Sequence, residues 1–252
     1  MFKKLSTYIL IIMLSFAASA SEDSISQFTY GYLKRVNDFL SEGDYENAEK
    51  ELSIISKRYF LNEQSYERSL INQLWGNLYA TIGDYQKAID SYEASLRFRK
   101  IPLITNLQVR ANLAQCYFQT KDFDKVIETL LTYKNIAEQR GQEFSPLQKV
   151  ILGLSYNYNE EYLQAYKYIK SANDSSLSYN EDWLRYELSL AYKLKKFEEA
   201  TDLAQLLIYL NPEKKEYWKQ LSGLYFTQED DDKSLAGLEL AYDNNLLVKN
   251  NE

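Results

Sequence analysis

The stretch EYWKQLSGLYFTQEDDDKSLAGLELAY (Glu216–Tyr242) spaces large and small residues at regular intervals. Trp218, Leu221, Ser222 and Tyr225 follow one another at intervals of three, one and three residues. Because residues three or four apart lie on the same face of a helix, this spacing predicts a helix. A second apolar pattern follows the acidic run EDDD. The stretch therefore predicts two helices joined by a short turn.

Five other segments carry a similar pattern. They begin at Gly43, Gly76, Ala114, Gly153 and Ser189, with the sequences GDYENAEKEL, GNLYATIGDYQKAIDSYEASL, AQCYFQTKDFDKVIETL, GLSYNYNEEYLQAYKYI and SLAYKLKKFEEATDLAQLL. The residue in the middle of each copy, small in most of them, recurs at intervals of 40, 38, 39, 35 and 34 residues, at Ala48, Ala88, Val126, Ala165, Ala200 and Ser234. A period of this length indicates an architecture of stacked repeats.

The six copies resemble tetratricopeptide repeats, and the stretch from Glu216 is the best match to their Trp-x2-Leu-Gly-x2-Tyr signature. The resemblance implies an all-α, right-handed superhelical solenoid of about six helix-turn-helix repeats. The repeats are expected near residues 29–62, 69–102, 107–140, 146–179, 182–214 and 215–248, within a single solenoid over 21–252. The polar loop at 171–182 is the best candidate for a hinge in it.

Small and aromatic residues predict how the helices of each repeat meet. Close crossings are expected at the small residues of the first helices, Gly76, Ala114, Gly153, Ser189 and Ser222. Aromatic residues three positions later should fill the gaps between helices, at Tyr79, Tyr117, Tyr156, Tyr192 and Tyr225. The fifth repeat has one residue fewer between Tyr192 and the Phe197 that opens its second helix, which predicts a tighter turn.

The first 20 residues have the order of a secretory signal peptide. Lys3 and Lys4 precede an uncharged run that ends in Ala-Ser-Ala, before an acidic segment. This order predicts cleavage after Ala20 and export, with no transmembrane span left after cleavage. The alternative is an uncleaved anchor, for which the sixteen uncharged residues are short against the ~20 of a bilayer span.

The composition argues against several classes of function. The chain has no His, which removes imidazole catalysis and most zinc sites. Without Lys3 and Lys4 it has 27 basic and 36 acidic residues, a net charge of −9 that disfavours nucleic acid. Cys116 is expected to be a buried, inert thiol, and the run at Glu229–Asp232 to cap a helix rather than bind calcium. We therefore predict a protein that is not an enzyme and has no cofactor, metal or small-molecule substrate.

The tetratricopeptide resemblance places a partner-binding groove along the first helices. In the early repeats the expected lining is mostly amides, which can bond to the backbone of an extended segment: Asn37, Gln73, Asn77, Gln115 and the aromatic Phe118. In the later repeats it is apolar or aromatic: Leu154, Tyr158, Tyr186 and Leu190. The alternative is that the amides bond to neighbouring helices. Their neighbours are not basic, so a clamp for a terminal carboxylate is not expected.

A narrower resemblance covers the C-terminal third, NPEKKEYWKQLSGLYFTQEDDDKSLAGLELAYDNNLL. This segment is similar to the tetratricopeptide proteins that accompany second TonB energy-transduction systems in marine gram-negative bacteria. The resemblance implies a periplasmic adaptor for the inner-membrane complex of TonB, ExbB and ExbD. The alternative function is a cell-envelope assembly scaffold that binds outer-membrane or peptidoglycan machinery.

Overall fold

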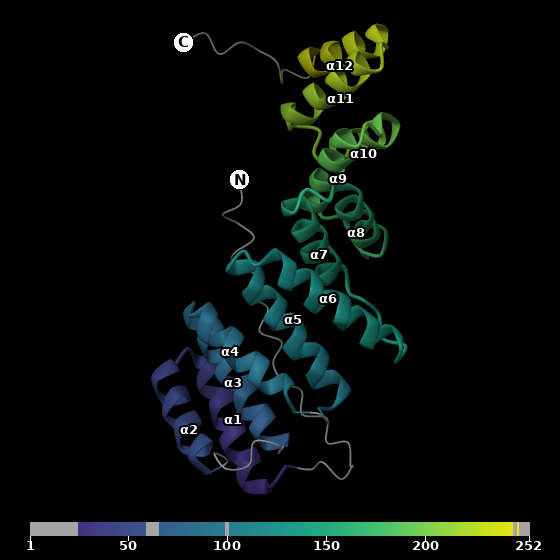
Figure 1. Ribbon diagram of the computed structural model, residues 1–252. Coiled ribbons are helices and arrows are strands. Elements are labelled where there is room, and N and C mark those ends of the chain that lie inside the picture. The colour runs from purple at the N-terminus through teal and green to yellow at the C-terminus, as the bar shows by residue number, and fades with distance from the viewer. Residues whose placement is uncertain (1–24, 59–65, 99–100, 244–245, 247–252) are drawn as a thin grey trace. The chain divides into compact units, whose positions relative to one another are not determined.

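The computed structural model describes residues 25–58, 66–98, 101–243 and 246. This part of the chain is helical and contains no strand (Figure 1). Its helices are α1 (Gln27–Glu42), α2 (Tyr45–Arg58), α3 (Tyr66–Ile82), α4 (Tyr85–Leu96), α5 (Leu103–Gln119), α6 (Phe123–Glu138), α7 (Pro146–Tyr158), α8 (Tyr162–Asp174), α9 (Glu181–Lys193), α10 (Phe197–Leu210), α11 (Lys215–Thr227) and α12 (Asp231–Asp243). The all-α repeat fold is thus confirmed. The predicted signal peptide lies outside the described residues.

The helices pack in six consecutive pairs, and each pair is one repeat with an odd-numbered first helix and an even-numbered second helix. The chain divides into two compact units, unit 1 over Met1–Phe144 with α1 to α6 and unit 2 over Ser145–Glu252 with α7 to α12. The boundary does not fall in the segment 171–182 that we predicted as a hinge loop. That segment contains the end of α8, a connector over 175–180 and the start of α9, all inside unit 2. A single right-handed solenoid stays a prediction.

All six repeats use the same turn between their two helices. The second-last residue of the turn is left-handed, with φ between 57° and 86°, at Gly43, Gly83, Lys121, Glu160, Lys195 and Glu229. The next residue donates its backbone N–H to the carbonyl five positions earlier, at 2.9–3.0 Å. In the sixth repeat this next residue is Asp230, whose carboxylate accepts the backbone N–H of Lys233 at 3.2 Å. The acidic run thus caps a helix, as predicted.

The shared turn corrects the alignment of the fifth repeat. Lys196 donates to the carbonyl of Ala191, whereas the equivalent donors of the fourth and sixth repeats bond to Tyr156 and Tyr225. Ala191, and not Tyr192, is therefore the equivalent of those tyrosines. The predicted tighter turn is wrong, because the turn has the common length. Ser189 is exposed and does not lie at a helix crossing. The buried Leu188 is the residue at the position that is equivalent to the crossings of the other repeats.

Small residues lie at the predicted crossings of other repeats. A Cβ atom on Gly76 would lie 2.5 Å from the ring of Tyr92, and one on Gly153 would lie 2.8 Å from Ile169 Cγ1. In the sixth repeat, Ser222 Oγ donates to the carbonyl of Ser234 at 2.9 Å. Atoms of the paired helix lie so close at these points that larger side chains are excluded.

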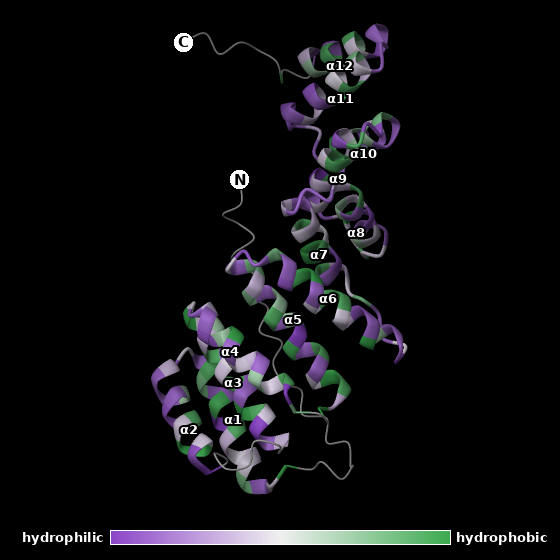
Figure 2. Ribbon diagram, in the orientation of Figure 1, coloured by the Kyte–Doolittle hydropathy of each residue, from purple (hydrophilic) through white to green (hydrophobic). Residues whose placement is uncertain are grey.

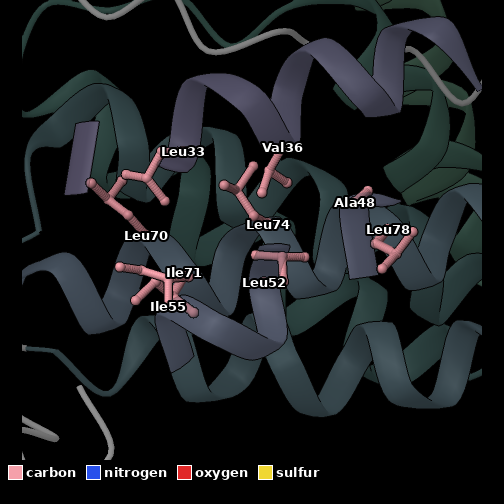
Figure 3. Packing of buried hydrophobic residues seen from close by; sticks show 9 residues of the cluster. All are labelled: Leu33, Val36, Ala48, Leu52, Ile55, Leu70, Ile71, Leu74 and Leu78. Carbon is pink, nitrogen blue, oxygen red and sulfur yellow. The ribbon is translucent and has the colours of Figure 1, made fainter. Parts of the chain in front are cut away.

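The core of unit 1 shows how successive repeats share apolar residues. Figure 3 shows side chains from α1, α2 and α3 pointing toward one another. All of them are at most 1 % exposed: Leu33, Val36, Ala48, Leu52, Ile55, Leu70, Ile71, Leu74 and Leu78. Along the helices of both units, hydrophobic residues alternate with hydrophilic ones (Figure 2). Each pair of helices therefore depends on its neighbour for burial, as in other repeat proteins.

Within the units, polar contacts also join second helices to the first helix of the next repeat. The hydroxyl of Tyr117 on α5 donates to the carboxylate of Glu93 on α4. Gln205 on α10 donates to the hydroxyl of Tyr225 on α11 at 2.8 Å. Glu93 and Gln205 occupy equivalent positions, ten residues after the left-handed residue of their own turn. This position therefore makes a polar contact to the next repeat in both places.

Glu187 on α9 is a buried carboxylate at another such contact. It is 3 % exposed, accepts a hydrogen bond from Asn173 Nδ2 at 2.7 Å, and lies 3.7 Å from Lys170 Nζ. Burial raises the pKa of Glu187 above its ordinary value, and the two partners oppose that shift only in part. The folded state therefore holds the proton more tightly than the unfolded state does.

This raised pKa predicts how stability depends on pH. A group with a higher pKa in the folded state loses stabilising free energy as pH rises through the range between its two pKa values. As pH rises above the ordinary pKa of a glutamate, the wild type should therefore lose stability relative to Glu187→Gln, in urea melts at each pH. Glu198→Gln, at an exposed position of α10, is the control. A pH-independent difference between Glu187→Gln and the wild type would contradict the prediction.

Candidate functional site

Asn77 is enclosed in a polar network of unit 1 and does not present its amide to a partner as we predicted. It is 3 % exposed, and its Oδ1 accepts hydrogen bonds from the hydroxyl of Tyr92 at 2.7 Å and from Asn112 Nδ2 at 3.3 Å. Tyr92 is itself 1 % exposed, and burial raises its pKa. The alternative interpretation, in which such an amide bonds to neighbouring helices, holds for Asn77.

Three other predicted lining residues are also buried. The exposed fractions are 1 % for Gln73, 2 % for Leu154 and 3 % for Leu190. Leu190 was predicted from the alignment that the shared turn corrects. In the corrected alignment, the exposed Ser189 occupies the groove position of the fifth repeat. The side chains of these three residues pack inside the helical stack, so a partner could not reach them without displacing helices.

The remaining predicted residues are at least partly exposed. Asn37, Gln115 and Phe118 in unit 1 and Tyr186 in unit 2 are half-buried, and Tyr158 is 40 % exposed. The pKa of Tyr186 is raised, first by burial and then by neighbours that include Asp182 and Tyr158. Tyr158 at the end of α7 and Tyr186 on α9 both belong to unit 2.

An exposed row of aromatic residues lies in unit 2. The sequence interpretation included Tyr158 in the expected groove and missed Tyr192, which it assigned to a gap between helices. Tyr158, Tyr192 and Phe226 lie at the ends of the three first helices α7, α9 and α11, each within the last two residues. Tyr192 and Phe226 occupy equivalent positions, three residues before the left-handed residue of their turns, and Tyr158 lies two residues before that of its own turn. Their exposed fractions are 40 %, 51 % and 69 %. We call these three residues the aromatic row. The short spacing from Tyr192 to Phe197 was the signal that could have placed Tyr192 on the surface.

Exposed lysines accompany the aromatic row on the same first helices. Lys193 follows Tyr192 directly, and its Nζ lies 4.1 Å from the centre of the Tyr162 ring. Lys219 is exposed on α11, two turns before Phe226. The ring of Tyr192 packs edge-on against Phe197, with 5.9 Å between the ring centres. The row thus combines supported aromatic faces with positive charge, which suits apolar and acidic side chains of a partner.

The one thiol of the chain has no nucleophilic character. Cys116 on α5 is 3 % exposed, and burial raises its pKa to about 12, so it is protonated near neutral pH. It borders a shallow pocket of unit 1 whose lining is Ala80, Tyr85, Tyr92, Asn112, Gln115, Cys116 and Gln119. This lining offers amides and rings but no carboxylate or basic side chain. An inert, buried Cys116 agrees with the prediction.

Two further observations concern the described residues alone. Among residues 25–58, 66–98, 101–243 and 246, no three acidic or Cys side chains gather as a metal site would require. Within the same ranges, every helix is too short or too polar to cross a bilayer.

Comparison with known proteins identifies the fold. No family model and no curated protein matches the sequence. Among solved structures, a tetratricopeptide-repeat protein from Parabacteroides merdae superposes with a TM-score of 0.58 at 18 % identity, over 86 % of this chain and 80 % of that one. MamA superposes with a TM-score of 0.57 at 17 % identity, over 70 % of this chain and 91 % of that one. The fold is that of a tetratricopeptide-repeat protein.

A third similar structure is also a protein with this fold. YrrB, a tetratricopeptide-repeat protein with an unusual peptide-binding site, superposes with a TM-score of 0.59 at 14 % identity, over 75 % of this chain and 90 % of that one. At such identities the likeness concerns the tetratricopeptide fold. Function has to be argued from the surface of this chain.

Proposed function

We propose that this protein is a non-enzymatic adaptor that binds a segment of another protein along the first helices of unit 2. The observation that carries the proposal is the aromatic row, Tyr158, Tyr192 and Phe226, which exposes three large rings on successive first helices. Truncating aromatic anchors of this kind often costs much of the binding free energy in protein interfaces. The peptide-binding site of YrrB supports such a use of the fold.

We further propose that the adaptor works in the periplasm and supports a complex of TonB, ExbB and ExbD. The signal-peptide pattern of residues 1–20 supports export, and the resemblance of the C-terminal third supports the TonB connection. The protonated, buried Cys116 and the absence of His from the sequence support a role without catalysis.

Affinity purification from the periplasmic fraction tests this proposal. The tagged full chain should begin at Ser21 when its amino terminus is sequenced, and it should retain segments of TonB, ExbB or ExbD. The Tyr192→Ala, Phe226→Ala double variant should retain them poorly. Recovery of outer-membrane or peptidoglycan machinery instead would favour the assembly scaffold. A cytoplasmic chain that begins at Met1 would contradict export.

A further inference from the structure

The helix α12 exposes two positions that the second helices α4, α8 and α10 bury. Counted from the left-handed residue of the turn, the sixth and ninth positions carry Ile89 and Tyr92 in the second repeat, at 4 % and 1 % exposure. In the fourth repeat they carry Tyr166 and Ile169, at 5 % and 0 %. In the fifth they carry Thr201 and Ala204, at 8 % and 0 %.

In the sixth repeat, the same two positions carry Leu235 and Leu238, which are 58 % and 37 % exposed. Tyr242, one turn further along α12, is 65 % exposed. We call Leu235, Leu238 and Tyr242 the α12 face. No described helix packs on it, although the spacing of three and four residues gives it the apolar stripe of a helix–helix contact. The α12 face is thus continuous with the interfaces that join the other repeats.

A polar group completes the likeness between the α12 face and the interfaces inside the stack. Glu239 lies ten residues after the left-handed Glu229 and is therefore the equivalent of Glu93. The carboxylate of Glu93 accepts a hydrogen bond from the hydroxyl of Tyr117, which lies on the first helix of the next repeat. Glu239 is exposed, and Asp231, Asp232 and Asp243 lie on the same helix. The one lysine of α12, Lys233, already pairs with Asp230 at 2.7 Å. The surroundings of the stripe are therefore acidic.

From this arrangement we propose that the α12 face is a docking surface for an amphipathic helix of a partner protein. The partner helix should carry an apolar stripe and, opposite Glu239, a tyrosine hydroxyl or the cation of a lysine or arginine. It would bind as the first helix of a further repeat does, with its apolar stripe over Leu235 and Leu238. The acidic flank favours a helix with a basic edge.

A second copy of this chain fits the α12 face less well. Two α12 helices packed on each other would bring Glu239 and the aspartates of both copies together. At the other end of the chain, α1 has Lys34 and Asp38 at the positions where α3 has the buried Leu74 and Leu78. Packing α1 on α12 would therefore bury two charged side chains against leucine, which is unfavourable.

A peptide from the chain itself is the probe for this proposal. A peptide with the sequence of α5, LITNLQVRANLAQCYFQ with Cys116→Ser, contains the tyrosine that meets Glu93 and has one basic residue, Arg110. Titrated into the full chain, it should bind, and Leu238→Asp should weaken binding at least about tenfold. Leu235→Asp, at a more exposed position, should act in the same direction. Leu163→Asp, which alters a 52 % exposed leucine on α8, should have no effect.

The contact with Glu239 has its own test. The Tyr117→Phe peptide should bind more weakly than the Tyr117 peptide to the wild-type chain, and this difference should vanish in Glu239→Gln. Failure of the peptide to bind, or equal binding to the wild type and Leu238→Asp, would overturn the proposal. So would a concentration-dependent dimer that Leu238→Asp dissociates, because the occupant would then be a second copy.

Discussion

A Gly76→Leu substitution is expected to lower the free energy of unfolding by about 3 kcal/mol or more, the upper end of the cost of overpacking. The first added atom alone would lie 2.5 Å from two carbons of the Tyr92 ring. That ring cannot move away cheaply, because Tyr92 is 1 % exposed and its hydroxyl donates to Asn77. The helices α3 and α4 would have to separate, which would also disturb the Asn77–Asn112 contact.

Gly223→Leu is the matched control for this substitution. Gly223 lies within α11, and no heavy atom lies within 4 Å of the position where its Cβ would stand. Leucine has a higher helix propensity than glycine, so Gly223→Leu should raise stability by up to about 1 kcal/mol. Urea denaturation of the two variants and the wild type measures the difference. Equal stability of Gly76→Leu and the wild type would show that the α3–α4 crossing is not as close as described.

Removal of two rings of the aromatic row should have the largest effect on partner binding. The Tyr192→Ala, Phe226→Ala double variant is expected to weaken binding by more than about 2 kcal/mol, roughly thirtyfold. Both side chains are more than half exposed, so the loss should come without a change in stability. The effect should also persist at moderate salt, because neither residue is charged. Calorimetric titration with the partner recovered from the periplasm measures it.

The control for this double variant removes exposed apolar side chains from second helices. Tyr209 on α10 is 81 % exposed and Leu163 on α8 is 52 % exposed. The Tyr209→Ala, Leu163→Ala variant therefore removes a comparable exposed apolar surface away from the first helices. If it weakens binding as much as the loss of Tyr192 and Phe226 does, the aromatic row is not the specific contact surface.

The repeat pattern was predictable from the sequence because close helix crossings demand small residues at a fixed period. Gly76, Gly153 and Ser222 were expected at such crossings and lie there. The start of the second helices at Tyr85, Phe123 and other aromatic residues follows from the same spacing. The turn that all six repeats share shows which residues of different repeats are equivalent. The type of a single residue does not show this.

The candidate site was less predictable, because exposure depends on contacts between repeats. Asn77 bonds to Asn112, which lies 35 residues away in the next repeat, and no local spacing indicates that pair. In the fifth repeat, Ala191 and Tyr192 are adjacent, and the tyrosine matches the signature of the family better. The buried Ala191 is nevertheless the equivalent of the tyrosines in the other repeats. The solvent-facing ring of Tyr192 was thereby assigned to a gap between helices, although Tyr158 had been expected in the groove.

Photocrosslinking in exported protein tests most directly the central claim, that the partner binds along the first helices of unit 2. A photoreactive residue replaces Tyr192 in one variant and the exposed Glu198, at the start of the second helix α10, in another. The partner should crosslink at position 192, and the crosslink should be lost when Phe226→Ala is added. Crosslinks that form at position 198 and not at position 192 would contradict it.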